Sequence, residues 1–263
     1  MTETLKRKQL IRYSHMMYQA GWVANHDGNL SSRIGRDRLV ITPTAMSKID
    51  IGLDDLVVVD GQGKKIAGRR RPFSEMVLHL AVFNQRSDVG AVIHAHPPFA
   101  TAFGVAGRPL PHPFLPEAVV SLGGSIPTVP LSMPGRDAAD ALNPFVRRCD
   151  AVMIAGNGVL AWGPDLELAY LRLELVEHVA KIAHHSHNLG GVQQLPQDMV
   201  QALLAKRQKA GLGAPDEFGD ARSESRESRV QSEVIKAVAG RMPSGDLEQI
   251  RKLTREIAES ILT

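Results

Sequence analysis

The sequence predicts an α/β fold in which short strands alternate with amphipathic helices. Several apolar runs of four or five residues have the length of buried strands, and Gly, Pro or Asp bounds them. Longer segments, as at 166–183, carry apolar residues at the three- and four-residue spacing of a helix. With 263 residues, 43% of them hydrophobic, the chain is long enough to bury a substantial core.

The first part of the chain predicts a helix, three strands and a second helix. Residues 2–22 place four apolar side chains on one helical face: Leu10, Tyr13, Met17 and Ala20. The strands are expected at 30–34, 39–42 and 56–59. Ser74 has the side chain of a helix N-cap, and the helix after it is expected to bury Val77, Leu80 and Phe83.

The second part predicts two more buried strands and four helices. The strands are expected at 90–96 and 151–155, and the helices at 97–105, 137–148, 166–183 and 196–209. The helix at 166–183 has the strongest periodicity. It is expected to face the core with Leu168, Leu171, Leu175, Val179 and Ile182.

The composition changes after residue 190. We therefore expect one domain over residues 1–190 and a helical C-terminal extension over 191–263. The stretch near 214–229 is rich in Ser, Arg and Glu, which predicts a flexible charged linker. Two short amphipathic helices are expected to close the chain, and the second has Leu247, Ile250, Leu253 and Ile257 on one face.

Composition argues against several classes of partner and compartment. The net charge is +3, only 5% of residues are aromatic, and no basic stripe is present, so no nucleic-acid partner is expected. Cys149 is the single cysteine, which favours a reducing, cytoplasmic location. Residues 2–22 lack the features of a signal peptide. The sequence contains no run of eighteen apolar residues, so no membrane partner is expected.

The segment His94-Ala95-His96 predicts a metal site. It ends the apolar run that begins at Gly90, and Pro97 follows it. Side chains two residues apart on a strand point to the same face, so the two imidazoles project side by side. Paired histidines at the end of a strand can occupy neighbouring positions around one metal ion.

Several ordered motifs resemble the class II aldolase/adducin family, of the fuculose-phosphate aldolase type. The resemblance spans residues 5–182 and rests on these motifs: Gly28-Asn29-Leu30-Ser31-Ser32-Arg33, Ile41-Thr42-Pro43-Thr44-Ala45, Ser74-Glu75 with His79, Val92-Ile93-His94-Ala95-His96-Pro97, Leu115-Pro116-Glu117-Ala118 and Val159-Leu160-Ala161-Trp162-Gly163.

This resemblance implies a mixed, mostly antiparallel sheet flanked by helices. It also implies a homotetramer with active sites at subunit interfaces. His94 and His96 correspond to ligands of a divalent metal, typically zinc, which stabilises an enolate-like intermediate. Glu75 corresponds to the catalytic acid/base and is a candidate third ligand, whereas His79 is expected to support the site rather than to bind the metal.

One departure concerns the metal. Asn157 stands where members of the family carry a third histidine, and an amide oxygen is a poorer zinc ligand than an imidazole. Two histidines and Glu75 remain, a donor set that also suits iron or manganese. Other histidines could compensate only if the fold brings them to the site: His112, His178, His184, His185 and His187.

A second departure concerns the substrate. The resemblance implies that an anionic group binds near residues Gly28, Asn29, Thr44, Ala45, Phe73 and Ser74. Phe73 replaces a serine and Ala45 replaces a glycine, so a carboxylate or an aromatic acid is an alternative to a phosphate. Phe73 either walls the substrate site or packs into the core beside Leu80.

The function that we expect is a metal-dependent carbon–carbon lyase acting on a small oxo or hydroxy substrate. Glu75 and Asn157 are the expected catalytic residues, and the reaction is either aldol cleavage or decarboxylation. Two alternatives remain open. One is a non-haem iron oxygenase of an aromatic or 2-oxo acid, and the other is a non-catalytic, adducin-like interaction domain.

Overall fold

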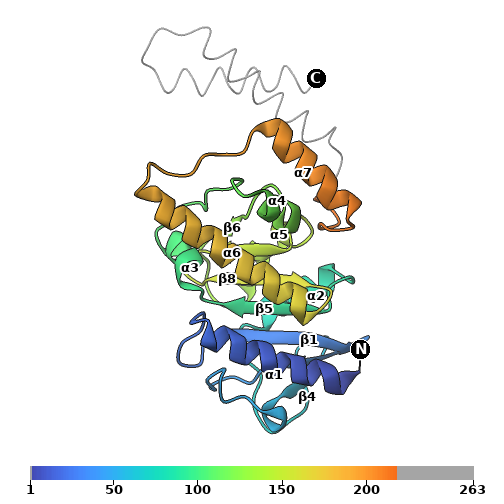
Figure 1. Ribbon diagram of the computed structural model, residues 1–263. Coiled ribbons are helices and arrows are strands. Elements are labelled where there is room, and N and C mark those ends of the chain that lie inside the picture. The colour runs from blue at the N-terminus through green and yellow to red at the C-terminus, as the bar shows by residue number, and fades with distance from the viewer. Residues whose placement is uncertain (1, 218–263) are drawn as a thin grey trace, which may run out of the picture. The chain divides into compact units, whose positions relative to one another are not determined.

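The computed structural model describes residues 2–217, which build one eight-stranded sheet with helices on both faces (Figure 1). The strands are β1 (Asn29–Gly35), β2 (Arg38–Ile41), β3 (Val57–Asp60), β4 (Lys65–Ala67), β5 (Ala91–Ala95), β6 (Thr128–Val129), β7 (Ala151–Ile154) and β8 (Val159–Gly163). The part of the predicted linker beyond residue 217, and the closing helices, lie outside the described residues.

The sheet is mixed and mostly antiparallel, which confirms the predicted fold class. Its strand order is β4-β3-β2-β1-β5-β8-β7-β6. The pair β6–β7 is parallel, and the other neighbours are antiparallel. Strand β5 therefore lies in the interior of the sheet, between β1 and β8, where both of its edges are hydrogen-bonded.

The helices that flank the sheet agree with most of the predicted positions. They are α1 (Glu3–Gln19), α2 (Met76–Gln85), α3 (Pro98–Val105), α4 (Pro116–Leu122), α5 (Arg136–Val146), α6 (Leu166–His187) and α7 (Gln197–Lys209), with a short 3-10 helix at Leu53–Asp55. Within residues 2–217, none of these helices has the length and apolar character needed to cross a membrane.

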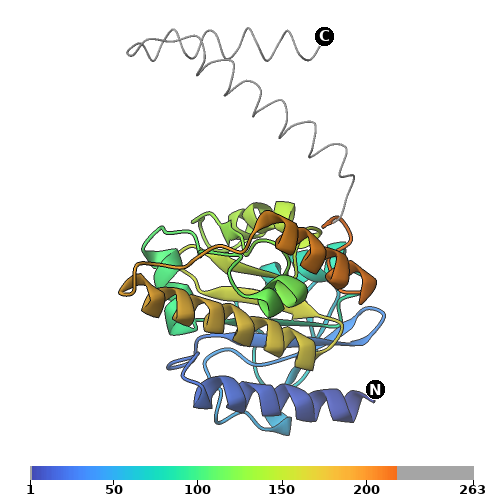
Figure 2. The same cartoon turned by 45° about the horizontal axis from the view of Figure 1, so that its top comes forward.

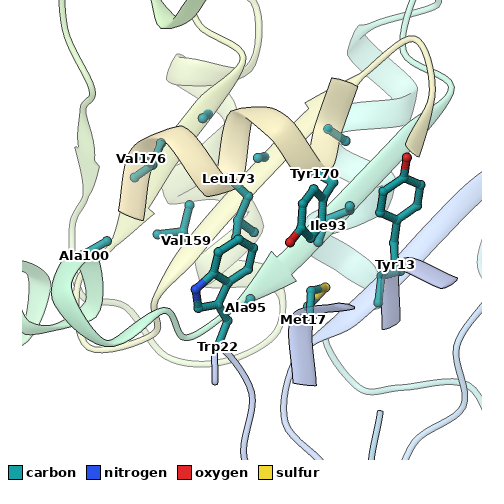
Figure 3. Close-up of a cluster of buried hydrophobic side chains, with 14 of the residues drawn as sticks. Tyr13, Met17, Trp22, Ile93, Ala95, Ala100, Val159, Tyr170, Leu173 and Val176 are labelled. Carbon is teal, nitrogen blue, oxygen red and sulfur yellow. The ribbon is translucent and has the colours of Figure 1, made fainter. Parts of the chain in front are cut away.

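Two hydrophobic clusters lie on opposite faces of the sheet. The first joins α1 and α6 to the strands, and α1 lies beside α6 on this face (Figure 2). Its aromatic centre is Tyr170, whose ring lies 5.1 Å from Tyr13 and 5.3 Å from Trp22 (Figure 3). The second cluster joins α2 and α5 to the other face. Burial on both faces holds β5 rigidly in place.

The buried face of α6 differs from the prediction. Of the predicted residues only Val179 is fully buried, and Leu171 is 47% exposed. The helix instead buries Ala169, Tyr170, Leu173, Val176, Ala180 and Ala183, together with Arg172 and Glu177. Apolar residues surround much of this helix, so their spacing alone did not identify the face that packs. The two polar residues are buried because tertiary partners satisfy them.

The start of α2 also differs from the prediction. Ser74 is exposed and does not cap the helix; the N-cap position belongs to Glu75, whose side chain makes no capping hydrogen bond. Val77 and Leu80 are only partly buried, whereas Phe83 is buried as predicted. The carboxylate of Glu75 is therefore free of the backbone and available for contacts with distant strands.

Asp150, directly before β7, binds three buried arginines. Its Oδ1 lies 3.0 Å from Arg86, and its Oδ2 lies 2.8 Å from Arg172 and 2.9 Å from Arg207. We call these four residues the arginine cluster. Arg207 belongs to α7, which packs against α4. The described part of the predicted extension therefore contacts the sheet domain, while the domain division after residue 190 stays a prediction.

Candidate metal and active site

His94 lies on β5 and His96 directly follows its last residue, and both side chains project toward α2. Ala91, Ile93 and Ala95 belong to the cluster under α1 and α6, whereas Val92 belongs to the cluster under α2. Because alternate side chains of a strand share a face, the side chains of His94 and His96 point to the same side as Val92, the side covered by α2. The side chain of His94 is fully buried, whereas that of His96 is 31% exposed. 

Hydrogen bonds fix the orientation of both imidazoles. Nδ1 of His94 donates to the carbonyl of Val159 at 3.0 Å. Nδ1 of His96 lies 3.1 Å from the Asp27 carboxylate. With both Nδ1 atoms engaged in this way, the two Nε2 atoms carry lone pairs, and they face each other at 3.2 Å. Burial lowers the pKa of His94, which favours its neutral form.

The two facing lone pairs fit a bound cation. Two nitrogen ligands at about 2.1 Å from one metal ion, in neighbouring positions, lie about 3 Å apart. The observed separation of 3.2 Å agrees with that geometry. Without a cation or a shared proton, these two acceptors would oppose each other in a largely buried site. The imidazole pair therefore has the chemistry of a metal site.

Glu75 lies beside the imidazoles, held by two amides. Its Oε2 is 3.5 Å from Nε2 of His94 and accepts a hydrogen bond from Asn29 at 2.8 Å. Its Oε1 accepts one from Asn157 at 2.8 Å. Burial alone would raise the pKa of Glu75, but the charge that His94 carries when protonated and the two amide donors outweigh burial and lower the pKa to about 2. The group is therefore a carboxylate at neutral pH.

The carboxylate is turned toward the amides rather than toward a point shared with both imidazoles. Within residues 2–217, no three His, Cys, Asp or Glu side chains already surround a common metal position. The two imidazoles are therefore candidate ligands, and Glu75, whose Oε2 lies 3.5 Å from Nε2 of His94, is a candidate third. Whether Glu75 binds a metal stays a prediction.

Asn157 reaches the site from the tight turn between β7 and β8. The backbone N–H of Ile154 donates to the carbonyl of Gly158 at 2.7 Å, which closes the turn. Gly158 has φ +76°, and a Cβ there would lie 2.2 Å from the carbonyl oxygen of Ala95. Only glycine permits this approach. The turn places the Asn157 amide against Glu75, 82 residues away in the sequence.

Two polar residues near the site, Asp27 and Lys48, were not predicted. The Asp27 carboxylate orients the His96 ring. Lys48 is 1% exposed, and its ammonium donates to the carbonyls of Met46 at 3.0 Å and His26 at 3.3 Å. Burial lowers the pKa of Lys48 to about 8. A lone lysine in a loop carries no sequence signal for burial.

A cleft of about 500 Å³ adjoins the site. Glu75 and Asn157 line it, together with Ser74 and the exposed Leu131. Most of its other lining residues are apolar, among them Val77, Leu78, Ile154 and Ala155. A small molecule in the cleft can therefore reach the carboxylate and the Asn157 amide together.

The predicted substrate residues lie in different surroundings. Gly28, with φ +69°, passes so close to Val23 that a Cβ would clash at 2.5 Å. Asn29 is buried, Thr44 is partly buried and Ser74 is exposed at the cleft. Ala45 is exposed and has φ +55°, a conformation that favours the glycine of the family pattern. Phe73 is 7% exposed, belongs to the cluster under α2 and is absent from the cleft lining.

The other histidines make contacts elsewhere. His184 and His185 lie against Phe99, and Nε2 of His112 is 2.8 Å from the carbonyl of Gly123. His178 and His187 are exposed on α6. Among the described residues, none of these five makes a hydrogen bond or ring contact with His94 or His96.

The sequence is similar to proteins of known activity. It is 27% identical over 203 residues to a 5-deoxy-D-ribulose 1-phosphate aldolase of Bacillus thuringiensis, covering 76% of this chain and 94% of that protein. It is 28% identical over 187 residues to a 3-oxo-tetronate 4-phosphate decarboxylase of Haemophilus influenzae, covering 69% and 88%. These relatives confirm the predicted reaction class, a metal-dependent lyase.

The fold is also similar to that of a solved structure. An L-fuculose 1-phosphate aldolase superposes with a TM-score of 0.72 at 27% identity, over 79% of this chain and 98% of that one. The family model of the class II aldolase and adducin N-terminal domain matches residues 8–184. The chain therefore belongs to the class II aldolase and adducin family.

Proposed function

We propose that this enzyme cleaves a carbon–carbon bond of a small oxo or hydroxy substrate, by aldol cleavage or decarboxylation. His94, His96 and Glu75 hold a divalent cation, with zinc as the first choice. The observation that carries this proposal is the pair of imidazole nitrogens facing each other at 3.2 Å beside a carboxylate. This donor set adjoins a cleft large enough for a small substrate.

A divalent cation held there supplies Lewis acidity, which stabilises negative charge on a substrate oxygen. Glu75 is the group that moves a proton at the substrate carbon. The hydrogen bonds from Asn29 and Asn157 keep it ionised, so it begins as a base. When the carboxylate turns toward substrate or cation, the Asn157 amide becomes free to bind a substrate oxygen.

The anionic end of the substrate is proposed to bind near Gly28, Asn29, Thr44, Ala45 and Ser74. Among residues 2–217, no lysine or arginine lines the cleft, so hydroxyl, amide and backbone N–H groups would hold a phosphate or a carboxylate. The burial of Phe73 supports its role in core packing over the alternative of a substrate wall.

A homotetramer with sites at its subunit interfaces is also part of the proposal. Apolar side chains that are exposed near the cleft and along α6 support it. Leu131 and Met133 are 78% and 70% exposed, and Leu171 is 47% exposed. Exposed apolar groups that lie together, as Leu131 and Met133 do in one loop, are typical of surfaces that bind another protein. Sedimentation velocity would measure the number of chains.

The first experiment is elemental analysis of protein purified without added metal, followed by Zn²⁺ titration. About one zinc or manganese per chain would support the lyase. His94→Ala should abolish that occupancy, whereas His178→Ala, which changes an exposed histidine on α6, should leave it unchanged. Full metal occupancy in His94→Ala would contradict the site.

A second candidate function follows from the donor set. Two histidines and one carboxylate also form the ligand set of non-haem iron oxygenases. Stoichiometric iron, together with oxygen uptake on an aromatic or 2-oxo acid, would favour that function. Protein that neither contains nor binds a divalent ion would instead favour a non-catalytic interaction domain.

A further inference from the structure

A continuous chain of hydrogen bonds runs from the sheet to the catalytic carboxylate. The hydroxyl of Ser31 on β1 lies 2.6 Å from Nδ1 of His79 on α2. Nε2 of the same ring lies 2.6 Å from Oδ1 of Asn29. The amide nitrogen of Asn29 then donates to Oε2 of Glu75 at 2.8 Å. Four side chains thus connect the centre of the sheet to the site.

The ionised carboxylate of Glu75 determines which group donates and which accepts in each of these hydrogen bonds. An ionised carboxylate can only accept, so Asn29 must present its amide nitrogen to Glu75. Its oxygen then faces His79, whose Nε2 must carry the hydrogen. The neutral ring has no second hydrogen, so Nδ1 must accept one from the hydroxyl of Ser31. With Glu75 ionised and the His79 ring neutral, no other assignment satisfies all four groups.

Burial gives the chain its rigidity. Ser31 and His79 are 0% exposed and Asn29 is 4% exposed, so bulk water does not replace a missing partner. The ring of Phe73 lies 4.9 Å from that of His79 and covers it. Glu75 and His79 are one helical turn apart at the start of α2, so their spacing is also fixed.

We propose that His79 is a positioning residue, held in the single tautomer with hydrogen on Nε2, which keeps the Asn29 amide turned toward Glu75. It touches neither substrate nor metal. Its effect on the reaction rests on the proposed function, in which Glu75 is the working carboxylate. The hydroxyl of Ser31 supports this tautomer by donating a hydrogen bond to Nδ1 on the other side of the His79 ring.

The tautomer of His79 can be measured directly by ¹H–¹⁵N NMR of the imidazole nitrogens in the metal-free protein at pH 7. The expected spectrum shows a protonated Nε2 and an unprotonated Nδ1, with the signals assigned by their loss in His79→Gln. A hydrogen on Nδ1, or a doubly protonated ring, would overturn the proposal.

Zn²⁺ affinity tests the consequence for Glu75. His79→Leu removes both hydrogen bonds and should weaken Zn²⁺ binding about 10- to 100-fold, the usual effect of losing a group that orients a ligand. His79→Gln can still donate to Asn29 and should restore most of the affinity. Equal loss in the two variants, or no loss in His79→Leu, would contradict a positioning role.

A matched pair of serine variants remains informative if His79→Leu does not fold. Ser31→Ala should weaken Zn²⁺ binding, because the ring loses its partner at Nδ1. Ser32→Ala is the control, since that hydroxyl donates only to the carbonyl of Gly90 on the other side of the strand. The same Zn²⁺ affinity in both variants would overturn the proposal. Wild-type protein that binds no Zn²⁺ would contradict the proposed function, and the tautomer would then decide the orientation of Asn29 alone.

Discussion

The arginine cluster and the candidate metal site are both buried polar groups at the sheet, yet they differ in whether their polar atoms remain available to a ligand. In the arginine cluster, the two oxygens of Asp150 contact three guanidinium groups, and Asp150 is 0% exposed. In the metal site, two imidazole nitrogens face each other, and the Glu75 side chain is 28% exposed at a cleft. The first arrangement is closed to ligands, whereas the second is open to one.

A buried carboxylate in a functional site differs from one in a structural ion pair in whether it can exchange its partners. A carboxylate enclosed by arginines supports the fold, because all of its partners come from the protein. A carboxylate held only by neutral amides keeps its charge while it can still exchange partners. Metal binding and proton transfer both require such an exchange.

The largest effect on stability is expected in the arginine cluster. Asp150→Ala leaves three buried guanidinium groups without their shared anion and should lower the free energy of unfolding by about 3–5 kcal/mol. Urea unfolding of the metal-free protein measures the loss. The control is Asp140→Ala, which removes an exposed pair with Arg136 and should cost about 0.5 kcal/mol or less. Equal losses would refute the distinction between the two regions.

Glu75→Gln should affect activity more strongly than stability. It keeps the shape of the side chain but removes the charge, so lyase activity should fall about 100-fold or more. The free energy of unfolding should fall by less than in Asp150→Ala, because the Glu75 side chain is 28% exposed at the cleft. Steady-state kinetics and urea unfolding of the same preparation check both points. A variant that keeps its activity would exclude Glu75 as the acid/base.

Acid should destabilise the metal-free protein through its buried histidines. Burial lowers the pKa of His79 to about 3, so the unfolded chain takes up a proton below pH 6.5 that the folded chain does not. Stability should therefore fall between pH 6.5 and 3, by about 1.4 kcal/mol per pH unit for this residue. Glu75 adds a loss between its ordinary pKa of 4.5 and about 2.

Urea unfolding at pH 7, 6 and 5 measures this slope. His79→Gln should give a shallower pH dependence than the wild type, whereas His178→Ala, at an exposed position, should not change it. Identical slopes in the wild type and His79→Gln would mean that His79 binds protons equally in the folded and unfolded states, which would contradict this prediction.

The smallest expected effect is a change in Zn²⁺ affinity when residue 157 is substituted. Asn157→His restores the third imidazole of the family pattern and should tighten Zn²⁺ binding about tenfold. It also removes one amide donor from Glu75. Isothermal titration with Zn²⁺ checks the change. Unchanged affinity would show that residue 157 does not reach the metal position.

Short-range patterns predicted much of this fold correctly. The alternation of β5 placed both histidines on one face, and most of the predicted helices lie where they were expected. Strands β4, β6 and β8 were missed. The first two have three and two residues, too short for a periodic signal, and β8 is buried along its whole length and shows no alternation.

Tertiary contacts decided which face of α6 is buried, which the spacing of apolar residues could not. The buried face of α6 includes Arg172, which Asp150 neutralises, and Glu177, which accepts the backbone N–H groups of Phe99 and Ala100. A pattern of apolar residues assigns such polar positions to the solvent. The partners that make their burial favourable lie far away in the sequence.

The sequence by itself determined the order of most elements, the pairing of His94 with His96 and the motifs of the family, because these depend on local spacing. Only the tertiary structure decided which partners those groups meet. It brought Asn157 to Glu75 across 82 residues and Ser31 to His79 across 48. Hydrogen-bond partners are set by how strands and helices pack in three dimensions, and a local pattern of residues does not encode contacts between segments that are far apart in the sequence.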